Sequence, residues 1–158
     1  MVPVAVGQQV SRIFHILLLF KKTSFVVLYT LMGLQIKISP ADRWFSLFIR
    51  ELADNKCEYC GNAGESIQNS HFYGRRAENT RFEPDNCIAV CFYHHQMLGS
   101  DDREAYRDFM IKKLGEKRFK TLRIQYNTYK KRDRKLEVIK WKKAYHDLCE
   151  EKKVILRA

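Results

Sequence analysis

The pattern of apolar and polar positions predicts a helix that begins at Pro40. Ser39 can cap its N-terminus, proline suits the first helical position, and Asp42 stands where a capping box places an acid. Apolar side chains then recur at helical spacing as far as about Asn55, and they are Trp44, Phe45, Phe48, Ile49 and Leu52. One face of this helix is therefore expected to pack against the next part of the chain.

A different pattern follows between residues 66 and 96. Residues 66–73 and 86–90 have the composition of two short strands, and a charged loop over residues 74–84 separates them. A helix is predicted to begin near Phe92. The order strand, loop, strand, helix predicts an α+β core in which two strands and one helix form a small unit.

Three more predicted segments are helical, and they follow Gly99. The first begins at residues 100–102 and ends at Gly115, which suits a helix C-terminus. The apolar positions of the three helices are Tyr106, Phe109, Met110 and Leu114, then Phe119, Leu122, Tyr126 and Tyr129, then Val138, Trp141, Tyr145 and Leu148. Lysines and arginines fall largely between them, so residues 101–158 are expected to form a basic helical tail beside a core of residues 39–100.

Charge is distributed unevenly along the chain. The 158 residues give room for one compact domain with attachments, and their formal net charge is +11. Residues 41–102 hold more acidic than basic side chains, whereas residues 103–158 are strongly basic. A basic helical region beside a more acidic core suits a polyanionic partner, and a solvated helix face is the alternative.

Five cysteines are present, and their spacing is typical of metal ligands. An odd count that includes a Cys-x-x-Cys pair does not fit a secreted disulfide framework and favours a reducing cytosol. Two pairs with the same spacing could bind one tetrahedral zinc ion as a structural site, and they are Cys57 with Cys60 and Cys91 with His94. His95 could replace His94, since adjacent helical residues point about 100° apart. Cys87 is expected to be a buried strand residue, and Cys149 has no partner in the pattern.

Three polar residues between the zinc ligands suit phosphodiester hydrolysis. His71, on the first predicted strand, can take a proton from water. Asn86, on the neighbouring strand, can hold that imidazole or its backbone in place. His95, on the helix, can bind a single Mg²⁺ or Mn²⁺ that faces the scissile phosphate and stabilises the departing 3′ oxygen. Each of these residues alone more often has a structural role. The prediction therefore depends on their order along the chain, within the segment that carries the candidate zinc ligands.

The segment from Cys57 to His95 resembles the ββα-metal HNH endonucleases. A narrower similarity, over about residues 56–120, is to the phage recombination nucleases called NinG or Rap, and it rests on residues 70–76, 80–82, 85–86, 91, 106–107 and 113–118. The resemblance implies metal-dependent cleavage of DNA, with branched recombination intermediates as a substrate, in a bacterial or phage-infected cytoplasm. It also implies His71 as general base, Asn86 as its positioning residue and His95 as the ligand of the catalytic ion.

Two positions depart from the HNH pattern. Many HNH enzymes have an aspartate immediately before the base histidine as a second metal ligand, and Ser70 stands there in this chain. Asn86 or Asn69 could serve instead. His94 stands where a fourth cysteine is more common. A non-catalytic zinc-finger module that binds DNA is therefore the alternative function.

Basic side chains in the loop between the strands are candidate DNA contacts. Guanidinium groups can grip phosphates through two hydrogen bonds, and the loop offers Arg75, Arg76 and Arg81. The alternative is that they pair with acids of the same segment, which are Glu78, Glu83 and Asp85. No base-reading element is recognisable, so we expect duplex or branched DNA to be held mainly by its phosphate backbone.

The first 38 residues form a separate apolar segment. Two apolar runs, 13–20 and 25–34, are split by a pair of lysines, and neither reaches the roughly 20 residues that span a bilayer. No small-x-small cleavage site follows them. We favour the interpretation that translation begins at Met32, and a membrane anchor through residues 13–36 is the alternative.

Overall fold

Helix α2 (Pro40–Leu52) begins with the predicted capping box. The Asp42 N–H donates to the Ser39 hydroxyl oxygen, and the Asp42 carboxylate accepts from the Ser39 backbone N–H at 3.0 Å. Phe45 and Ile49 are buried as expected. Leu52 is wrongly included in the predicted apolar face, because α2 ends at this residue and its side chain is 53% exposed.

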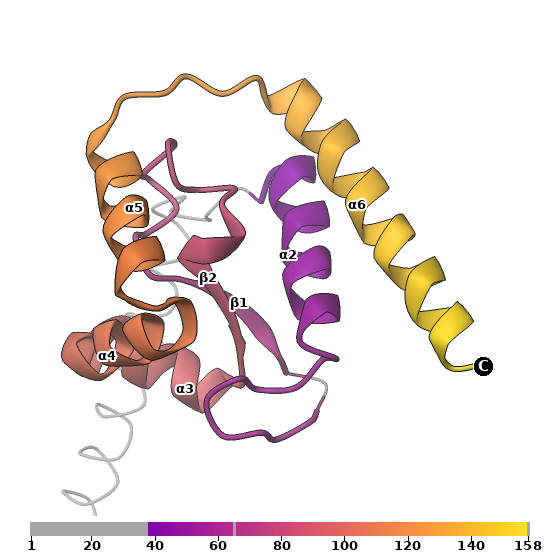
Figure 1. Cartoon of the computed structure of the whole chain (residues 1–158), viewed down its shortest axis with the longest axis horizontal. Helices are drawn as coiled ribbons and strands as arrows, with labels where there is room; N and C mark the ends of the chain where they lie inside the picture. The colour runs from indigo at the N-terminus through magenta and orange to yellow at the C-terminus, as the bar shows by residue number, and fades with distance from the viewer. Residues whose placement is uncertain (1–37, 65, 158) are drawn as a thin grey trace, which may run out of the picture. The chain divides into compact units, whose positions relative to one another are not determined.

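The two strands form an antiparallel pair that is shorter than predicted. Strand β1 (Gln68–His71) pairs with β2 (Cys87–Val90), so that His71 lies opposite Cys87. Asn86, which was expected to begin the second strand, instead ends a 3₁₀ turn over Pro84–Asn86. The short helix α3 (Phe92–Gln96) follows β2 and continues into a π-helical turn over Met97–Asp101. The predicted order of strand, loop, strand and helix is confirmed, and the fold is α+β (Figure 1).

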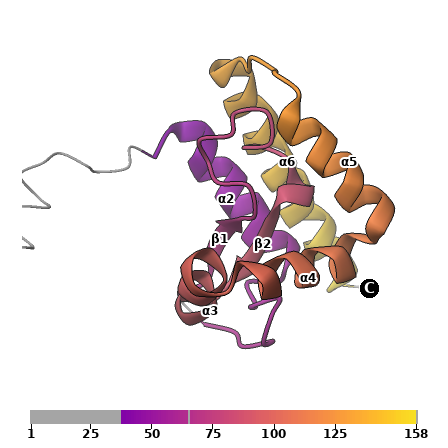
Figure 2. The same cartoon turned by 90° about the vertical axis from the view of Figure 1, so that its left-hand side faces the viewer.

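Three helices complete the described part of the chain, which comprises residues 38–64 and 66–157. They are α4 (Arg103–Leu114), α5 (Glu116–Asn127) and α6 (Arg134–Ile155). Asp102 caps α4, and Gly115 separates α4 from α5 with a φ of 76°, a value that glycine adopts without strain. In both views α6 runs alongside α2, and α2 also contacts the sheet (Figures 1 and 2).

Residues 101–157 share one hydrophobic core with the segment before them. The rings of Phe45 in α2 and Trp141 in α6 lie 4.6 Å apart, and Phe72 packs edge-on against both Tyr106 and Phe119. The C-terminal helices are thus packed against the sheet and α2 rather than extended beside them. Two aromatic residues assigned to buried faces are on the surface, because α5 ends at Asn127: these are Tyr126, 41% exposed, and Tyr129, 89% exposed.

Replacing Trp141 with alanine should lower the free energy of unfolding by about 3–5 kcal/mol. The side chain is 4% exposed, and its indole N–H donates to Glu137 at 2.8 Å, so both packing and a buried hydrogen bond are lost. Urea unfolding of the zinc-loaded protein, followed by circular dichroism, measures the change. Ile139→Ala, at an α6 position that is 66% exposed, is the control and should change the free energy by less than about 0.5 kcal/mol. Equal losses in the two variants would contradict the packing of α6 on the core.

None of the helices within residues 38–157 has the length and apolar character needed to cross a bilayer. The interpretations of the N-terminal segment, a start at Met32 or an anchor through residues 13–36, concern positions outside the described residues.

Candidate metal centre and adjoining cavity

Four side chains converge into a cluster that could hold a metal ion such as zinc. One ligand atom from each residue lies within 4.8 Å of the others, and the residues are Cys57, Cys60, Cys91 and His94. The His94 Nδ1 atom lies 3.1 Å from Cys91 Sγ and 3.7 Å from Cys57 Sγ. Ligand atoms around tetrahedral zinc lie about 3.5–3.8 Å apart, given its ordinary bond lengths. The sulfur and nitrogen donors therefore suit a structural zinc site, and His94 rather than His95 is the fourth member.

Local structure brings the two halves of this cluster together. Residues 57–62 form a tight turn in which Cys57 N–H donates to Asn62 and Gly61 N–H donates to Cys57, with Gly61 at a φ of 76°. Strand β2 ends immediately before Cys91, and α3 begins one residue later. A helix of only five residues is not stable alone, so a bound ion would fix it to the turn.

The environment of the cluster favours ionisation of one of its thiols. Burial of Cys57 opposes ionisation, but backbone N–H groups of Cys91, Cys60 and Tyr59 point at its sulfur and hold its pKa below the ordinary value. Thiolate is the form that binds zinc. The two other cysteines are not in the cluster: Cys87 is buried in β2, as predicted, and Cys149 lies in α6.

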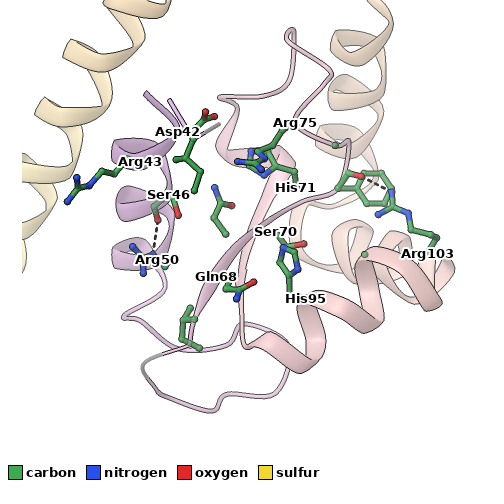
Figure 3. Close-up of a pocket in the computed structure, with 16 residues that line it drawn as sticks. Asp42, Arg43, Ser46, Arg50, Gln68, Ser70, His71, Arg75, His95 and Arg103 are labelled. Atoms are coloured by element: carbon green, nitrogen blue, oxygen red, sulfur yellow. Dashed lines mark hydrogen bonds between the residues drawn. The ribbon is translucent and has the colours of Figure 1, made fainter. Parts of the chain in front are cut away.

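A cavity of about 770 Å³ adjoins α3, and His95, the neighbour of the cluster residue His94, lies in its wall. Its wall includes residues of α2, β1, the loop after β1, α3 and the start of α4 (Figure 3). Both His71 and His95 belong to this wall, so the structure brings these two predicted site residues together. Arginines outnumber acids in the wall, with Arg43, Arg50, Arg75 and Arg103 against Asp42.

One ring nitrogen of His71 is held by the backbone. Its Nε2 atom lies 3.0 Å from the carbonyl oxygen of Arg81. Because a carbonyl oxygen only accepts, Nε2 carries the ring proton and the lone pair is on Nδ1. Burial, with a smaller contribution from the positive charge of Arg75, lowers the pKa of His71 to about 4. The imidazole is therefore neutral at physiological pH and its Nδ1 lone pair can accept a proton, but the lowered pKa makes it a weaker base than an ordinary histidine.

Asn86 holds the loop between the strands rather than the imidazole itself. Its Oδ1 accepts from the Tyr73 N–H at 2.8 Å, and its Nδ2 donates to the carbonyl oxygens of Tyr73 and Thr80. The side chain is fully buried. With its amide occupied in this way, Asn86 is not available as the second metal ligand that the sequence left open.

The other residues considered for the second metal ligand have different surroundings. Ser70 is buried, 3% exposed, and pairs with Ile88 in the sheet. Asn69 lies in the cavity wall, and its buried Oδ1 has no hydrogen-bond partner among the described residues. Asp42 supplies the carboxylate of the wall, but it is bound to Arg81 at 2.6 Å.

The three arginines predicted to contact DNA have different environments. Arg75 lies in the cavity wall beside His71 (Figure 3), and its charge adds to burial in lowering the pKa of both His71 and His95. Arg76 is exposed on the same loop and is not part of the wall. Arg81 is paired within the protein, as the alternative interpretation expected, and its side chain is only 13% exposed. These ion pairs favour the alternative interpretation for Arg81, and a contact between Arg81 and phosphate stays a prediction.

Sequence reasoning missed several residues of the cavity, among them Asp42 and Arg103. Asp42 had a role only as a helix cap, because its partner Arg81 is 39 positions away and no local pattern links them. Arg103 was not singled out, yet it lies in the wall and donates to the Phe72 carbonyl at 2.6 Å. An arginine in the first turn of α4 gave no signal apart from the general basic charge.

Comparison of the chain with protein-family models, with curated proteins and with solved structures found no match.

Proposed function

We propose that this protein is a metal-dependent endonuclease of the HNH type that hydrolyses DNA phosphodiester bonds. The observation that carries the proposal is the state of His71, a neutral imidazole whose proton is held on Nε2 by the Arg81 carbonyl. It stands in a cavity with His95 and Arg75. The order of two strands and a helix beside a possible zinc cluster also agrees with the HNH resemblance.

In this proposal the residues of the cavity have separate roles in hydrolysis. The Nδ1 atom of His71 takes the proton from the attacking water. Asn86 is a positioning residue, because it holds the loop that carries the Arg81 carbonyl. Arg75 counters the negative charge that builds up on the phosphate oxygens.

The donors of the cavity fit a catalytic divalent ion in part. His95 offers an imidazole, and Asn69 offers a buried oxygen that has no hydrogen-bond partner within residues 38–64 and 66–157. The one carboxylate that these residues give the wall, that of Asp42, is bound to Arg81. When bound at His95, Mg²⁺ or Mn²⁺ would act as a Lewis acid that stabilises the departing 3′ oxygen. Since Mg²⁺ prefers oxygen ligands, we expect Mn²⁺ to support the reaction better.

DNA would be held mainly through its backbone. Arginines share the cavity wall with His71 and His95, and exposed lysines and arginines are numerous on α4, α5 and α6. Such contacts bind phosphates without reading sequence, and their strength falls as salt concentration rises. Duplex or branched DNA is thus the proposed substrate class.

The test is nicking of supercoiled plasmid and of a synthetic four-way junction by the zinc-loaded full chain, with Mg²⁺, Mn²⁺ or neither. The proposal predicts nicking that requires added Mg²⁺ or Mn²⁺ and that does not require free zinc in the buffer. Junction cleavage faster than duplex cleavage would support branched recombination intermediates as the substrate. Absence of cleavage with every ion, by protein that binds DNA, would overturn the proposal.

The absence of an unpaired carboxylate in the described cavity wall favours a second candidate, a non-catalytic zinc module that binds DNA. This candidate predicts salt-sensitive binding of the same DNA molecules with no nicking. Replacing His71 with alanine would leave every measurable activity of such a module unchanged.

Replacing Arg75 with alanine should slow nicking at saturating DNA by about tenfold to a hundredfold. The reason is that its guanidinium lies beside His71 in the cavity (Figure 3). Arg76→Ala removes the same charge from the exposed side of the loop and should weaken DNA affinity by only about twofold to threefold, with little change in the saturated rate. Initial nicking rates over a range of DNA concentrations separate the two effects. Equal losses of the saturated rate would contradict the role of Arg75.

A further inference from the structure

The carbonyl group that holds His71 belongs to a residue whose own side chain is firmly bound. The Nε and Nη2 atoms of Arg81 donate to the two carboxylate oxygens of Asp42 at 2.8 and 2.6 Å. The two side chains are 13% and 6% exposed. A two-point contact of this kind fixes the orientation of the guanidinium as well as its position.

Asp42 is itself held in one orientation. Its Oδ2 accepts from the Ser39 backbone N–H at 3.0 Å and from the Ser39 hydroxyl at 2.7 Å, within the first turn of α2. Burial alone would raise the pKa of Asp42, but hydrogen bonds from Arg81 and Ser39 outweigh it and lower this pKa to about 2. The carboxylate is therefore charged at neutral pH and is anchored to a rigid helix.

The loop after β1 is folded around the guanidinium of Arg81. Besides Asp42, the Nη1 atom donates to the Arg75 carbonyl at 3.2 Å and to the Glu78 carboxylate at 3.0 Å. Within this loop Arg75 lines the cavity, and the Arg81 carbonyl accepts the hydrogen bond from His71. The placement of both therefore depends on where Asp42 holds Arg81.

We propose that Asp42 is a positioning residue for His71. By binding the Arg81 side chain it holds the Arg81 carbonyl against Nε2 of His71, which keeps the ring proton on Nε2 and the lone pair on Nδ1. The catalytic meaning of this arrangement rests on the proposed nuclease function, whereas the arrangement itself does not. A neutral imidazole in water exchanges its proton between the two nitrogens, so a fixed acceptor is needed to select one form.

A gain in the free energy of folding does not by itself explain the ion pair between Arg81 and Asp42. Buried pairs are costly to desolvate and often add little to the free energy of folding, whereas they can fix one geometry. A displacement of about 1 Å at a reacting group can cost about a hundredfold in rate. The expected signature of lost positioning is therefore a lower rate at saturating DNA with an unchanged affinity.

The experiment compares Asp42→Asn with Glu78→Gln in the zinc-loaded full chain. Glu78 also binds Arg81, but its side chain is 42% exposed, and no contact between it and α2 is seen within the described residues. Glu78→Gln is therefore the matched control. Two-bond ¹H–¹⁵N correlation spectra of the histidine rings report which nitrogen of His71 carries the proton. Wild type and Glu78→Gln should show the Nε2–H form alone, and Asp42→Asn should show both forms. The saturated nicking rate of Asp42→Asn should fall at least about tenfold, while its affinity for DNA without divalent ions does not fall.

Folding of the variants is controlled within the same experiment. Circular dichroism is used to choose a temperature at which Asp42→Asn is folded. Arg81→Lys is measured in parallel, because it keeps the charge but loses the two-point contact. This variant should show the same mixture of proton positions on His71. A single Nε2–H form with an unchanged rate in folded Asp42→Asn would overturn the proposal, as would equal effects of Asp42→Asn and Glu78→Gln. If the wild type does not nick DNA, the nuclease proposal fails and the ring spectra alone decide the role of Asp42.

Discussion

Replacing His71 with alanine is expected to slow DNA nicking by about a thousandfold without unfolding the protein. A positioned general base contributes about 10²–10⁴ to the rate of such a reaction. The imidazole is neutral near pH 7 because its pKa is lowered to about 4 by burial, so the basic nitrogen is available without a further step. Initial rates of plasmid nicking measure the effect, and fluorescence anisotropy checks that DNA affinity is retained.

His146→Ala is the matched control for this substitution. His146 is exposed on α6, where its ring packs beside Trp44 rather than in the cavity wall. Its loss should leave the nicking rate within about twofold of wild type. If the two histidine variants nick DNA at similar rates, His71 is not the general base.

Removing the metal from the cluster is expected to have the second large effect, a cooperative loss of structure around α3. Binding of structural zinc supplies about 10–16 kcal/mol in small zinc domains at neutral pH. Besides the cluster itself, the turn at residues 57–62 contacts the five-residue helix α3 through the rings of Tyr59 and His94, whose centroids lie 4.6 Å apart. Because His94 and His95 are adjacent on α3, loss of the ion should also displace His95 from the cavity and abolish nicking.

Metal content and thermal unfolding test this expectation together. Purified protein should contain zinc, a strong chelator should lower the melting temperature by at least about 10 °C, and readded zinc should restore it. Cys91→Ser should bind zinc weakly and melt early, while Cys149→Ser, outside the cluster, should match wild type. Unfolding that is unaffected by the chelator, with no metal in the protein, would contradict the zinc assignment.

Local patterns were sufficient to predict several parts of the fold and the metal cluster. The capping box of Ser39 and Asp42 involves residues three positions apart, so the helix start could be predicted from sequence. The stop at Gly115 is equally local. The four cluster ligands come from two short segments with the same spacing, and zinc chemistry restricts which residues can complete such a set.

Other parts of the site depend on contacts between distant segments and could not be predicted. Whether Arg81 meets a phosphate or Asp42 depends on how α2 packs against the loop, and the loop sequence is compatible with both. The same holds for Arg103, which lies in the cavity wall only because α4 begins beside Phe72. Tyr126 has helical spacing but lies at the end of α5, where its ring stacks on Tyr73 at 4.0 Å instead of entering the core.

The most direct test of the proposed hydrolysis is single-turnover cleavage of an end-labelled DNA by the zinc-loaded full chain in the presence of Mn²⁺. The proposed mechanism predicts that wild type leaves 3′-hydroxyl and 5′-phosphate ends, because water attacks phosphorus and the 3′ oxygen departs. It also predicts that His71→Ala cleaves about a thousandfold more slowly. No cleavage by wild type, products that carry a 3′-phosphate, or equal rates for wild type and His71→Ala would contradict it.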